Sequence, residues 1–508
     1  MTEPRHPHRD DSARPGRASD GRRGRRPRAA QPRGGQPRRD GSRPSARATA
    51  RPTARTVAFE VIRAVNDADA YANLLLPRAI ERAGLGTADA GLATELTYGT
   101  LRRLGYYDGV IALAASRPTE RIDPPVLDAL RLGAHQLLAT RVAAHAAVNE
   151  SVALARTVSG QATAGFVNAV LRTISRERPE RWLERVLETA RSDDERLSLE
   201  HSHPVWVVRA LRRSLAAEGR ADELHELLAA DNLAPRVTMI ALPGLASVPE
   251  GAERTEFSPY GFRLGGGDPE AIVRAAKGRV RVQDEGSQLA ALALTGATPV
   301  RPGERWLDLC AGPGGKTALL AADALRSGAT LDANEVSPAR AGLVRRAVAA
   351  VPMPVPVSEE DGRARRTTHP GSYDRVLVDA PCTGLGALRR RPEARWRKQP
   401  SDIPELSKLQ QELFLAGFDS LAPGGVLAYV TCSPHLAETR SVVAEARRVL
   451  GDAIEPLDAS EVLRRVCASE IDIVDSPGDG HVQLWPHRHG TDAMFISLFR
   501  RVDASAER

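Results

Sequence analysis

Residues 305–317, Arg305-Trp306-Leu307-Asp308-Leu309-Cys310-Ala311-Gly312-Pro313-Gly314-Gly315-Lys316-Thr317, decide the fold class of this 508-residue chain. The apolar run predicts a short buried strand that ends at Asp308, and the glycines predict a tight turn before a helix that opens near Lys316. Glycine lets the backbone approach a ligand closely, and a helix N-terminus offers unpaired N–H groups. We therefore expect a ligand-binding loop at the carboxyl end of a strand.

Two ligand chemistries suit such a loop. A phosphate-binding P-loop has the pattern Gly-x-x-x-x-Gly-Lys-Ser/Thr, and its first glycine would stand where this sequence has Cys310. The spacing of Asp308, Gly312 and Gly314 instead suits S-adenosylmethionine (SAM) in a Rossmann-like sheet. That interpretation requires an acid for the ribose hydroxyls about 20 residues further on, at the end of the next strand, and Glu335 stands there.

Two more strands are predicted to end in thiols. Residues 374–382 predict a buried strand that ends in Asp379 and Cys382, and residues 425–434 predict the next strand, which ends in Cys432. Leu406, Leu409, Leu413 and Leu421 predict one face of a helix between these strands. Because ligands in open α/β sheets bind outside the carboxyl ends of the strands, both thiols are expected beside the glycine loop.

Two thiols beside a methyl donor suit methylation of cytosine C5. This ring carbon is a poor nucleophile until a thiolate adds to C6, which breaks the aromaticity and makes C5 enamine-like. The C5 proton then leaves, and the thiolate departs by elimination. Asp379 is a candidate for hydrogen bonding to the base edge or for holding a protonated N3.

Charge is distributed unevenly along the chain. Residues 1–50 contain 14 Arg, no Lys, five acids and no Leu, Ile, Val, Phe, Trp or Tyr, so they carry a net charge of +9 and the remainder about −2. This arginine-rich tail is expected to be disordered, and either to contact RNA phosphates or to remain simply solvated. No run of 18 apolar residues and no apolar signal segment is present, and the four scattered cysteines form no Cys-x-x-Cys pair. We expect a cytoplasmic protein without a membrane span.

Changes in composition and periodicity along the sequence predict a multidomain protein. After the tail of residues 1–50, residues 51–175 show helical periodicity, for example at Val57, Val61, Ile62 and Val65, and predict a helical bundle of five to seven helices. Residues 176–285 predict a helical linker and a small α+β subdomain. Residues 286–503 predict a Rossmann-like α/β domain, because short apolar strands alternate with helical segments.

At these motifs the chain resembles the RNA (cytosine-5)-methyltransferases of the RsmB/NOP class, also called the Fmu or Sun family, from about Arg51 to Arg501. The resemblance rests on 310–317, 379–382 and 431–433, with further likeness in 282–288 and 490–495. It implies that Cys432 is the nucleophile and that Cys382 assists release of the enzyme from methylated RNA. It also implies a SAM site, with Glu335 in place of the more usual Asp, made of Cys310, Ala311, Gly312, Pro313, Gly314, Gly315, Lys316, Glu335, Asp361 and Asp379.

The helical segment 51–175 resembles the NusB-like RNA-binding domain of the bacterial 16S rRNA enzymes, through residues 148–152 and 165–172. That likeness favours small-subunit rRNA as the substrate; the alternatives are a tRNA cytosine, or an assembly factor without activity. The basic run 389–398, with its single aromatic Trp396, predicts either contacts to RNA phosphates and a stacked base or a solvated face. His487 and His489 lack further ligands at plausible spacing, so we expect no metal, and we expect a monomer.

Overall fold

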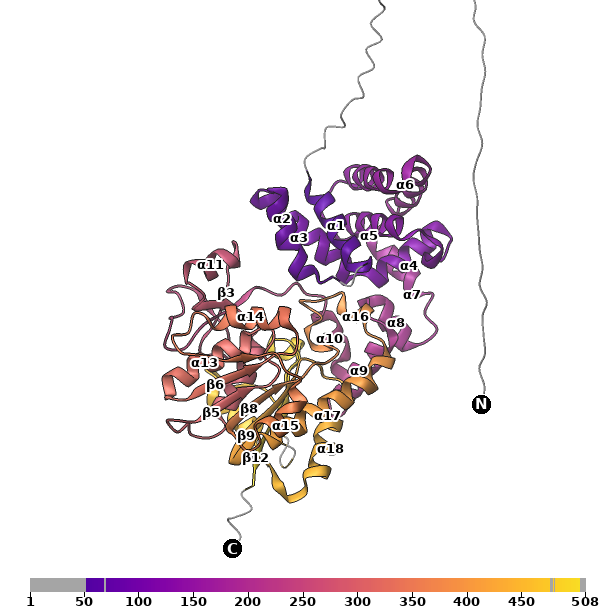
Figure 1. Cartoon of the computed structure of the whole chain (residues 1–508). Coiled ribbons are helices and arrows are strands. Elements are labelled where there is room, and N and C mark those ends of the chain that lie inside the picture. The colour runs from indigo at the N-terminus through magenta and orange to yellow at the C-terminus, as the bar shows by residue number, and fades with distance from the viewer. Residues whose placement is uncertain (1–51, 68–69, 476–477, 479, 503–508) are drawn as a thin grey trace, which may run out of the picture. The chain divides into compact units, whose positions relative to one another are not determined.

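The computed structural model describes residues 52–67, 70–475, 478 and 480–502, so the predicted arginine-rich tail lies outside the described residues. Its N-terminal part is helical (Figure 1). The helices are α1 (Ala54–Asp67), α2 (Ala72–Ala83), α3 (Thr87–Arg102), α4 (Leu104–Ala115), α5 (Pro124–Ala139) and α6 (Ala144–Ile174). The apolar positions of α1 are buried at helical spacing, and Gly160 (φ 85°) divides α6 into two helical pieces. The predicted helical bundle is confirmed.

A helical connection and a small sheet follow. The connection consists of α7 (Pro179–Leu187), α8 (Asp193–His201), α9 (Val205–Ala216) and α10 (Leu224–Ala230). The sheet is antiparallel in the order β2-β3-β1-β4, with β1 (Thr238–Ala241), β2 (Glu253–Arg254), β3 (Gly261–Arg263) and β4 (Val280–Val282), and with α11 (Pro269–Ala275) beside it. The boundaries at 50, 175 and 285 stay predictions, although the change from helices to strands falls between 230 and 238.

The C-terminal part is a mixed sheet in the order β10-β12-β9-β8-β5-β6-β7, with β11 paired to β12. Its strands are β5 (Arg305–Asp308), β6 (Thr330–Asn334), β7 (Val357–Ser358), β8 (Tyr373–Asp379), β9 (Leu421–Thr431), β10 (Ile454–Leu457), β11 (His481–Gln483) and β12 (Phe495–Arg501). Strands β5 to β9 are parallel to one another, and β12 runs antiparallel to β9. The predicted Rossmann-like domain is confirmed.

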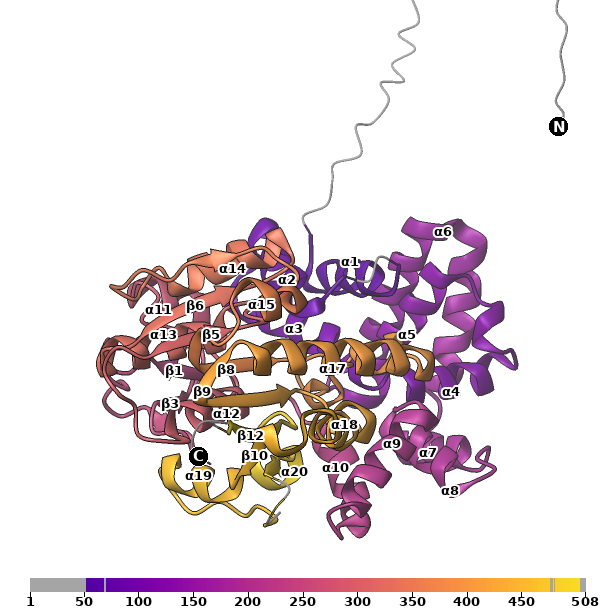
Figure 2. The same ribbon diagram turned by 60° about the horizontal axis from the view of Figure 1, so that its bottom comes forward.

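Helices cover both faces of this sheet. One face packs against α12 (Glu285–Gly296), α13 (Gly315–Ser327) and α19 (Ala459–Val466), and α14 (Pro338–Val348) packs beside α13. The other face packs against α17 (Ile403–Asp419) and α18 (Arg440–Leu450), which lie side by side in Figure 2. The shorter helices are α15 (Arg365–Thr368), α16 (Ala394–Arg397) and α20 (Pro486–His489).

Alternation along the strands explains this division. Leu427 and Tyr429 of β9 belong to the core beneath α17, whereas Val426, Ala428 and Val430 belong to the core beneath α12. Successive side chains of a strand point to opposite faces, so a strand that is buried on both faces must be continuously apolar. The unbroken apolar runs in the sequence are therefore typical of strands that are buried on both faces.

One predicted element boundary is wrong. Leu421 was expected on the helix with Leu406, Leu409 and Leu413, but α17 ends before it and Leu421 begins β9, opposite Tyr373. The backbone N–H of Ser420 closes the helix on Ala416 O. Leu421 is fully buried in the strand, as an inward-facing residue of the helix would be, so its apolar character alone does not distinguish a helix from a strand.

The strand order reverses beside β5. The chain proceeds outward from β5 to β6 and β7, and then crosses back to β8 and β9 on the other side. Such a reversal opens a crevice at the carboxyl ends of the strands on either side of it, here β5 and β8. The glycine-rich loop and the first turn of α13, which contains Lys316, follow β5; the loop that carries Cys382 follows β8, and the loop that carries Cys432 follows the neighbouring β9. The fold therefore places the predicted site residues at one edge.

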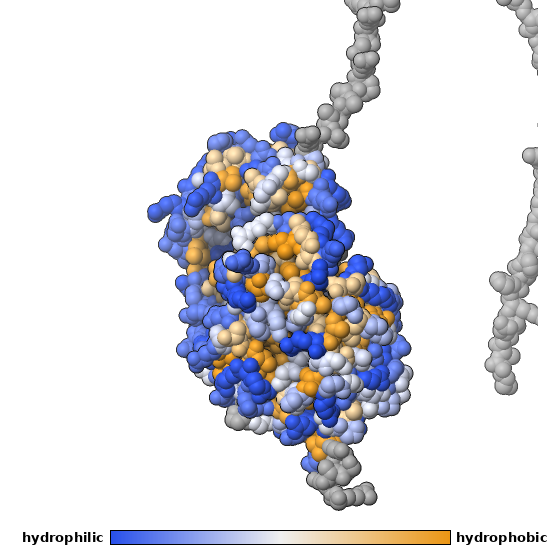
Figure 3. Space-filling view, turned by 90° about the vertical axis from the view of Figure 1, so that its left-hand side faces the viewer, coloured by the Kyte–Doolittle hydropathy of each residue, from blue (hydrophilic) through white to orange (hydrophobic). Residues whose placement is uncertain are grey.

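The surface carries apolar residues in scattered groups. The face seen in Figure 3 shows hydrophobic patches separated by hydrophilic residues. Among the described residues, no helix is long and apolar enough to cross a membrane.

A buried ion pair fixes the start of β8 against the segment before β5. The guanidinium of Arg375, 1% exposed, donates to Glu304 Oε2 at 2.7 Å and to Leu294 O at 2.9 Å. The indole N–H of Trp306 donates to the same carboxylate oxygen at 2.9 Å. Removing the arginine leaves a buried carboxylate without its counter-charge, which is costly.

We expect Arg375→Met to lower the free energy of unfolding by about 3–5 kcal/mol, measured by urea denaturation with tryptophan fluorescence. Arg301 pairs with the same Glu304 carboxylate at 3.6 Å, but its side chain is 75% exposed. Arg301→Ala is therefore the matched control and should cost less than about 1 kcal/mol. Equal losses for the two variants would contradict the burial argument.

Candidate active site

Two thiols meet at the carboxyl edge of the sheet. Cys382 follows β8, Cys432 follows β9, and their Sγ atoms lie 3.5 Å apart. Both side chains are partly exposed. The strands are parallel neighbours, with Asp379 opposite Val430, so residues just beyond these positions emerge together. A ligand in the crevice can reach both sulfur atoms.

The two thiols differ in acidity. The hydrogen bond between the two thiols lowers the pKa of Cys432; burial and the charge of Asp379 oppose this shift, and the charges of Lys316 and Arg391 reinforce it. The same hydrogen bond, burial and the charge of Glu438 raise the pKa of Cys382. Charges act on both thiols: Lys316 and Arg391 favour ionisation of Cys432 against the opposing charge of Asp379, whereas Glu438 disfavours ionisation of Cys382. Cys432 is the sulfur that the surroundings favour as a thiolate.

A buried carboxylate, which the sequence analysis missed, ties the two cysteine loops together. Glu438 is fully buried; its Oε1 accepts the backbone N–H of Thr383 at 2.7 Å, and its Oε2 accepts the Ser433 hydroxyl at 2.6 Å. Thr383 follows Cys382 and Ser433 follows Cys432, so one side chain fixes both loops. Glu438 lies six residues after Cys432, on the short helix 436–438, and no spacing rule signals its role.

Lys316 and Asp379 form an ion pair beside the thiols. Lys316 Nζ lies 2.8 Å from Asp379 Oδ2, and the two side chains are 11% and 24% exposed. Burial opposes the charged form of the lysine, but the neighbouring carboxylate raises the pKa of Lys316. The pair leaves the second oxygen of Asp379 near the crevice. It supplies both a cation and an acceptor for a polar ring edge.

The glycine-rich loop is folded tightly against Glu335. The backbone N–H of Gly312 donates to Glu335 Oε2 at 3.0 Å, and Arg340 lies 3.5 Å from the same oxygen. A Cβ on Gly312 would lie 2.2 Å from Glu335 Oε2, so any other residue there would displace the Glu335 carboxylate. Gly314 has φ +103°, and its Cβ would lie 2.5 Å from the Ala347 Cβ. The loop needs both glycines for packing and for backbone conformation.

Asp308 anchors the other side of the loop. Its Oδ2 accepts the Thr317 hydroxyl at 2.7 Å, while its buried Oδ1 has no hydrogen-bond partner among the described residues. Burial raises the pKa of Asp308 to about 7, and the charge of Asp379 adds to the shift. Helix α13 begins at Gly315, so its free N–H groups face this region.

The remaining predicted site residues take different positions. Ala311, Gly312 and Pro313 lie in the turn between β5 and α13. Cys310 lies in the same loop, and burial together with the charge of Asp308 raises the pKa of its thiol, so it is a poor competitor as nucleophile. Asp361 caps the short helix 362–364 after β7 and pairs with Arg363, with its side chain 47% exposed. Asp361 thus lies at the edge of the predicted set.

Two further segments close the crevice. Gly386 N donates to Cys432 O at 2.9 Å, and Ala493 N donates to Gly386 O at 2.8 Å. A Cβ on Gly386 would lie 2.1 Å from Ala493 O, so this close contact requires glycine. Asp492 is buried, forms an ion pair with Arg390, and donates its N–H to Asp284 Oδ1 at 3.0 Å. The segments 282–288 and 490–495 therefore support the cysteine loops.

The expectation for the basic run 389–398 is wrong in most of its residues. Arg395 is fully buried and donates to Ser202 O at 3.1 Å and to Asn232 Oδ1 at 2.9 Å. Arg389 is buried and donates to Gly490 O at 2.8 Å. Trp396 packs against the core of the helical domain, where a Cβ on Gly105 would lie 2.5 Å from its ring. Arg395 and Trp396 thus bind the helical segments and Arg389 binds within the catalytic domain, so all three side chains are engaged in contacts inside the protein.

The histidines near the C-terminus are engaged in internal hydrogen bonds. His487 Nε2 lies 2.8 Å from Glu223 Oε2, and His489 Nδ1 accepts the N–H of Trp485 at 2.8 Å. The His487 contact docks α20 onto the helical connection, whereas the His489 hydrogen bond is local to the α20 segment.

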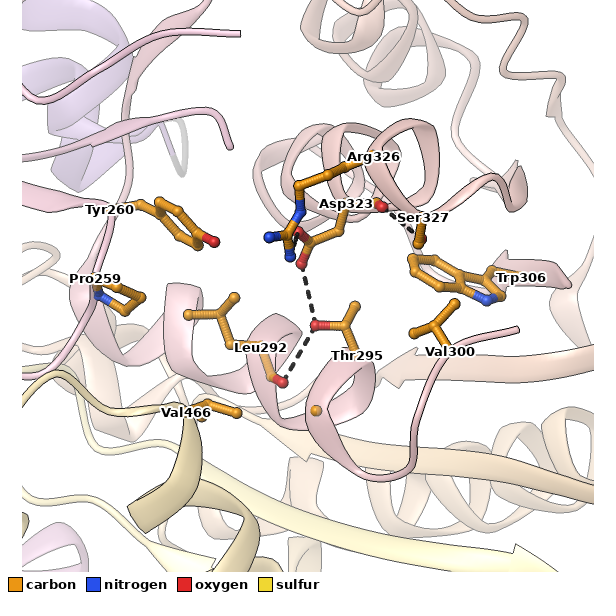
Figure 4. A pocket seen from close by; sticks show the side chains of 11 residues that line it. Pro259, Tyr260, Leu292, Thr295, Val300, Trp306, Asp323, Arg326, Ser327 and Val466 are labelled. Carbon is orange, nitrogen blue, oxygen red and sulfur yellow. Dashed lines mark hydrogen bonds and ion pairs between the residues drawn. The ribbon is translucent and has the colours of Figure 1, made fainter. Parts of the chain in front are cut away.

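A separate pocket lies at the other end of the strands. Figure 4 shows Asp323 between Arg326 and Thr295, and the cavity measures about 230 Å³. Its wall includes Ser327, the last residue of α13, whereas the active-site loop adjoins the first turn of that helix. This pocket is therefore remote from the thiols.

A doubly wound sheet, a glycine-rich loop at its switch point and paired thiols at the same edge define a methyltransferase. Residues 297–500 match the family described as 16S rRNA methyltransferase RsmB/F, and residues 52–176 match the NusB family. The chain belongs to the RsmB/F methyltransferase family and carries a NusB domain. The suggested resemblance to this family is thereby confirmed.

Individual relatives agree with this assignment. The putative methyltransferase MT1451 of Mycobacterium tuberculosis is 48% identical over 452 residues, which are 88% of this chain and 96% of that protein. Ribosomal RNA small subunit methyltransferase B of Pseudomonas putida is 33% identical over 405 residues, 76% of this chain and 87% of that protein. The crystal structure of PH0851 has a TM-score of 0.72 at 22% identity and covers 88% of this chain and 98% of its own, which shows a shared fold.

The lowered pKa of Cys432 predicts selective alkylation. Because iodoacetamide reacts with thiolates, Cys432 should be labelled first, with a midpoint below the ordinary thiol pKa of about 8.5. Cys382→Ala removes the hydrogen-bond donor and should move this midpoint to higher pH. Peptide mass spectrometry as a function of pH measures both effects.

Cys467 provides the control for this experiment. It is remote from the crevice, and burial raises the pKa of its thiol to about 12. Cys467→Ser should leave the labelling profile of Cys432 unchanged. Faster labelling of Cys382 or Cys310 than of Cys432 would contradict the assigned acidities.

Proposed function

We propose that this methyltransferase transfers a methyl group from SAM to C5 of a cytosine in small-subunit (16S) rRNA, through a covalent bond between Cys432 and C6. The observation that carries the proposal is the 3.5 Å contact between Cys382 Sγ and Cys432 Sγ beside the Lys316–Asp379 ion pair. The names of the RsmB/F family and of the Pseudomonas relative support rRNA as the substrate.

The residues around the glycine loop fit SAM. Glu335 is the carboxylate for the ribose hydroxyls, and Asp308 offers a buried oxygen without a hydrogen-bond partner in the described part of the chain. The start of α13, a helix of 13 residues, supplies N–H groups close to the loop. When bound, SAM supplies an electrophilic methyl group. Cys310 to Lys316 and Asp361 complete the proposed site.

Cys432 performs the first step. Its thiolate adds to C6 of the cytosine, the C5–C6 double bond opens, and negative charge develops over C5 and the N3 edge. Lys316 and Asp379 lie beside the thiols and stabilise that edge, Asp379 through a hydrogen bond or a shared proton at N3. C5 then bears enough electron density to accept the methyl group.

Cys382 serves the release of the product. After methylation C5 bears both a hydrogen and the methyl group, so a base must remove the C5 proton while the C6–S bond breaks and the Cys432 thiolate returns. Cys382 lies 3.5 Å from that sulfur, where it can assist this elimination. Glu438 holds the two cysteine loops in place through its hydrogen bonds to both of them.

Two other readings compete with this proposal. A tRNA cytosine would use the same chemistry, and the NusB domain together with the rRNA enzymes among the relatives favours rRNA. An assembly factor without activity would not require two thiols in contact beside an ion pair. Both alternatives are separated from the proposal by methyl transfer assays on purified RNAs.

The variants of the two cysteines should have opposite consequences. Cys432→Ala should abolish tritium transfer from labelled SAM to 16S rRNA, a loss of at least about 10³-fold, because no other group activates C5. Cys382→Ala should accumulate a protein–RNA adduct that survives a denaturing gel. Cys467→Ser is the control and should behave as wild type. Full activity of Cys432→Ala would refute the assignment of Cys432 as the nucleophile.

A further inference from the structure

An exposed tyrosine of the helical domain lies beside the catalytic loop. Tyr71 precedes α2 and is 45% exposed. Two guanidinium groups from the basic run lie over its ring, Arg391 at 5.6 Å and Arg397 at 5.2 Å from the ring centroid. The function described above does not use this half-exposed aromatic ring.

Backbone contacts hold the ring in this place. Arg397 donates to Val65 O at 2.8 Å and also to Ala70 O. The N–H of Ala72 donates to Glu393 Oε1 at 3.2 Å. The residues on both sides of Tyr71 are therefore bound to the segment 393–397 of the catalytic domain. This docking fixes the position of the ring relative to the active site.

Backbone hydrogen bonds connect the same segment to the loop that carries Cys432. Arg391 N donates to Ala387 O at 2.9 Å, and the neighbouring Gly386 N donates to Cys432 O at 2.9 Å. The charge of Arg391 contributes to the lowered pKa of Cys432. The Nε atom of Arg391 is buried and has no hydrogen-bond partner among the described residues. Arg391 thus lies between the Tyr71 ring and the thiol crevice.

We propose that Tyr71, with Arg391, binds a nucleotide next to the target cytosine, whose base stacks on the exposed part of the tyrosine ring while the Arg391 guanidinium faces its phosphate. This inference rests on the proposed function and deepens it. The NusB domain then contributes a residue to the substrate site itself, besides any binding of RNA at a distance.

Chemistry favours a single-stranded RNA segment as the occupant. Aromatic rings bind unstacked bases of any sequence through their faces, and guanidinium groups pair with phosphate. A cytosine whose C6 must meet Cys432 has to leave any helical stack, so its neighbours are unstacked as well. Tyr71 supplies the aromatic ring that the sequence analysis assigned to Trp396, which is instead packed in the domain interface.

The test measures RNA binding in the Cys432→Ala background, so that no turnover is required. The probe is a 16S rRNA transcript. Adding Tyr71→Ala should weaken binding about 5- to 150-fold, as expected for the loss of one stacked base, while Tyr71→Phe should stay within about 2-fold. Val449→Ala, which alters a 50% exposed side chain on α18, is the remote control and should have no effect.

The salt dependence of RNA affinity distinguishes two roles of Tyr71, namely stacking on a base and positioning the arginines. Loss of the ring alone should leave the slope of log affinity against log salt unchanged, because the number of phosphate contacts is the same. Unchanged affinity in Tyr71→Ala, or weaker binding with a reduced slope, would overturn the stacking proposal. With wild-type Cys432, absence of methyl transfer would refute the proposed function separately, since the binding measurement stands without it.

Discussion

The hydrogen bond between the Cys382 and Cys432 thiols is the interaction on which the active site depends. It favours Cys432 as the thiolate, and the charges of Lys316 and Arg391 reinforce this preference against that of Asp379, whereas Glu438 disfavours ionisation of Cys382. Sulfur atoms 50 residues apart in sequence reach this distance only because β8 and β9 are parallel neighbours. The strand order of the sheet thus brings the two thiols into contact.

Much of the architecture is readable from local pattern. Strands buried on both faces need continuous apolar runs, and ligand-binding turns need glycine, so β5, β8 and β9 with their loops are predictable from residues 305–317, 374–382 and 425–434. The strand-end thiols follow from the same reasoning. Leu421 shows the limit of that reasoning, because an apolar residue at the junction of a helix and a strand is buried in either case.

Features that depend on contacts distant in sequence were not predictable. Glu438 joins two loops through hydrogen bonds to Thr383 and Ser433, and only the tertiary structure brings these three residues together. The basic run 389–398 has the composition of an RNA-binding surface, yet Arg395 and Trp396 are used in the interface with the helical domain. Charge and aromatic content specify which contacts are chemically suitable, whereas topology decides which are made.

The covalent step is tested most directly by trapping it. An RNA substrate that contains 5-fluorocytidine cannot lose a proton from C5, so the protein–RNA bond should persist after methyl transfer. Mass spectrometry of the digested adduct should find the modified cytidine on the peptide that contains Cys432. A cytidine attached to the Cys382 peptide, or methylated RNA formed without any adduct, would contradict the account.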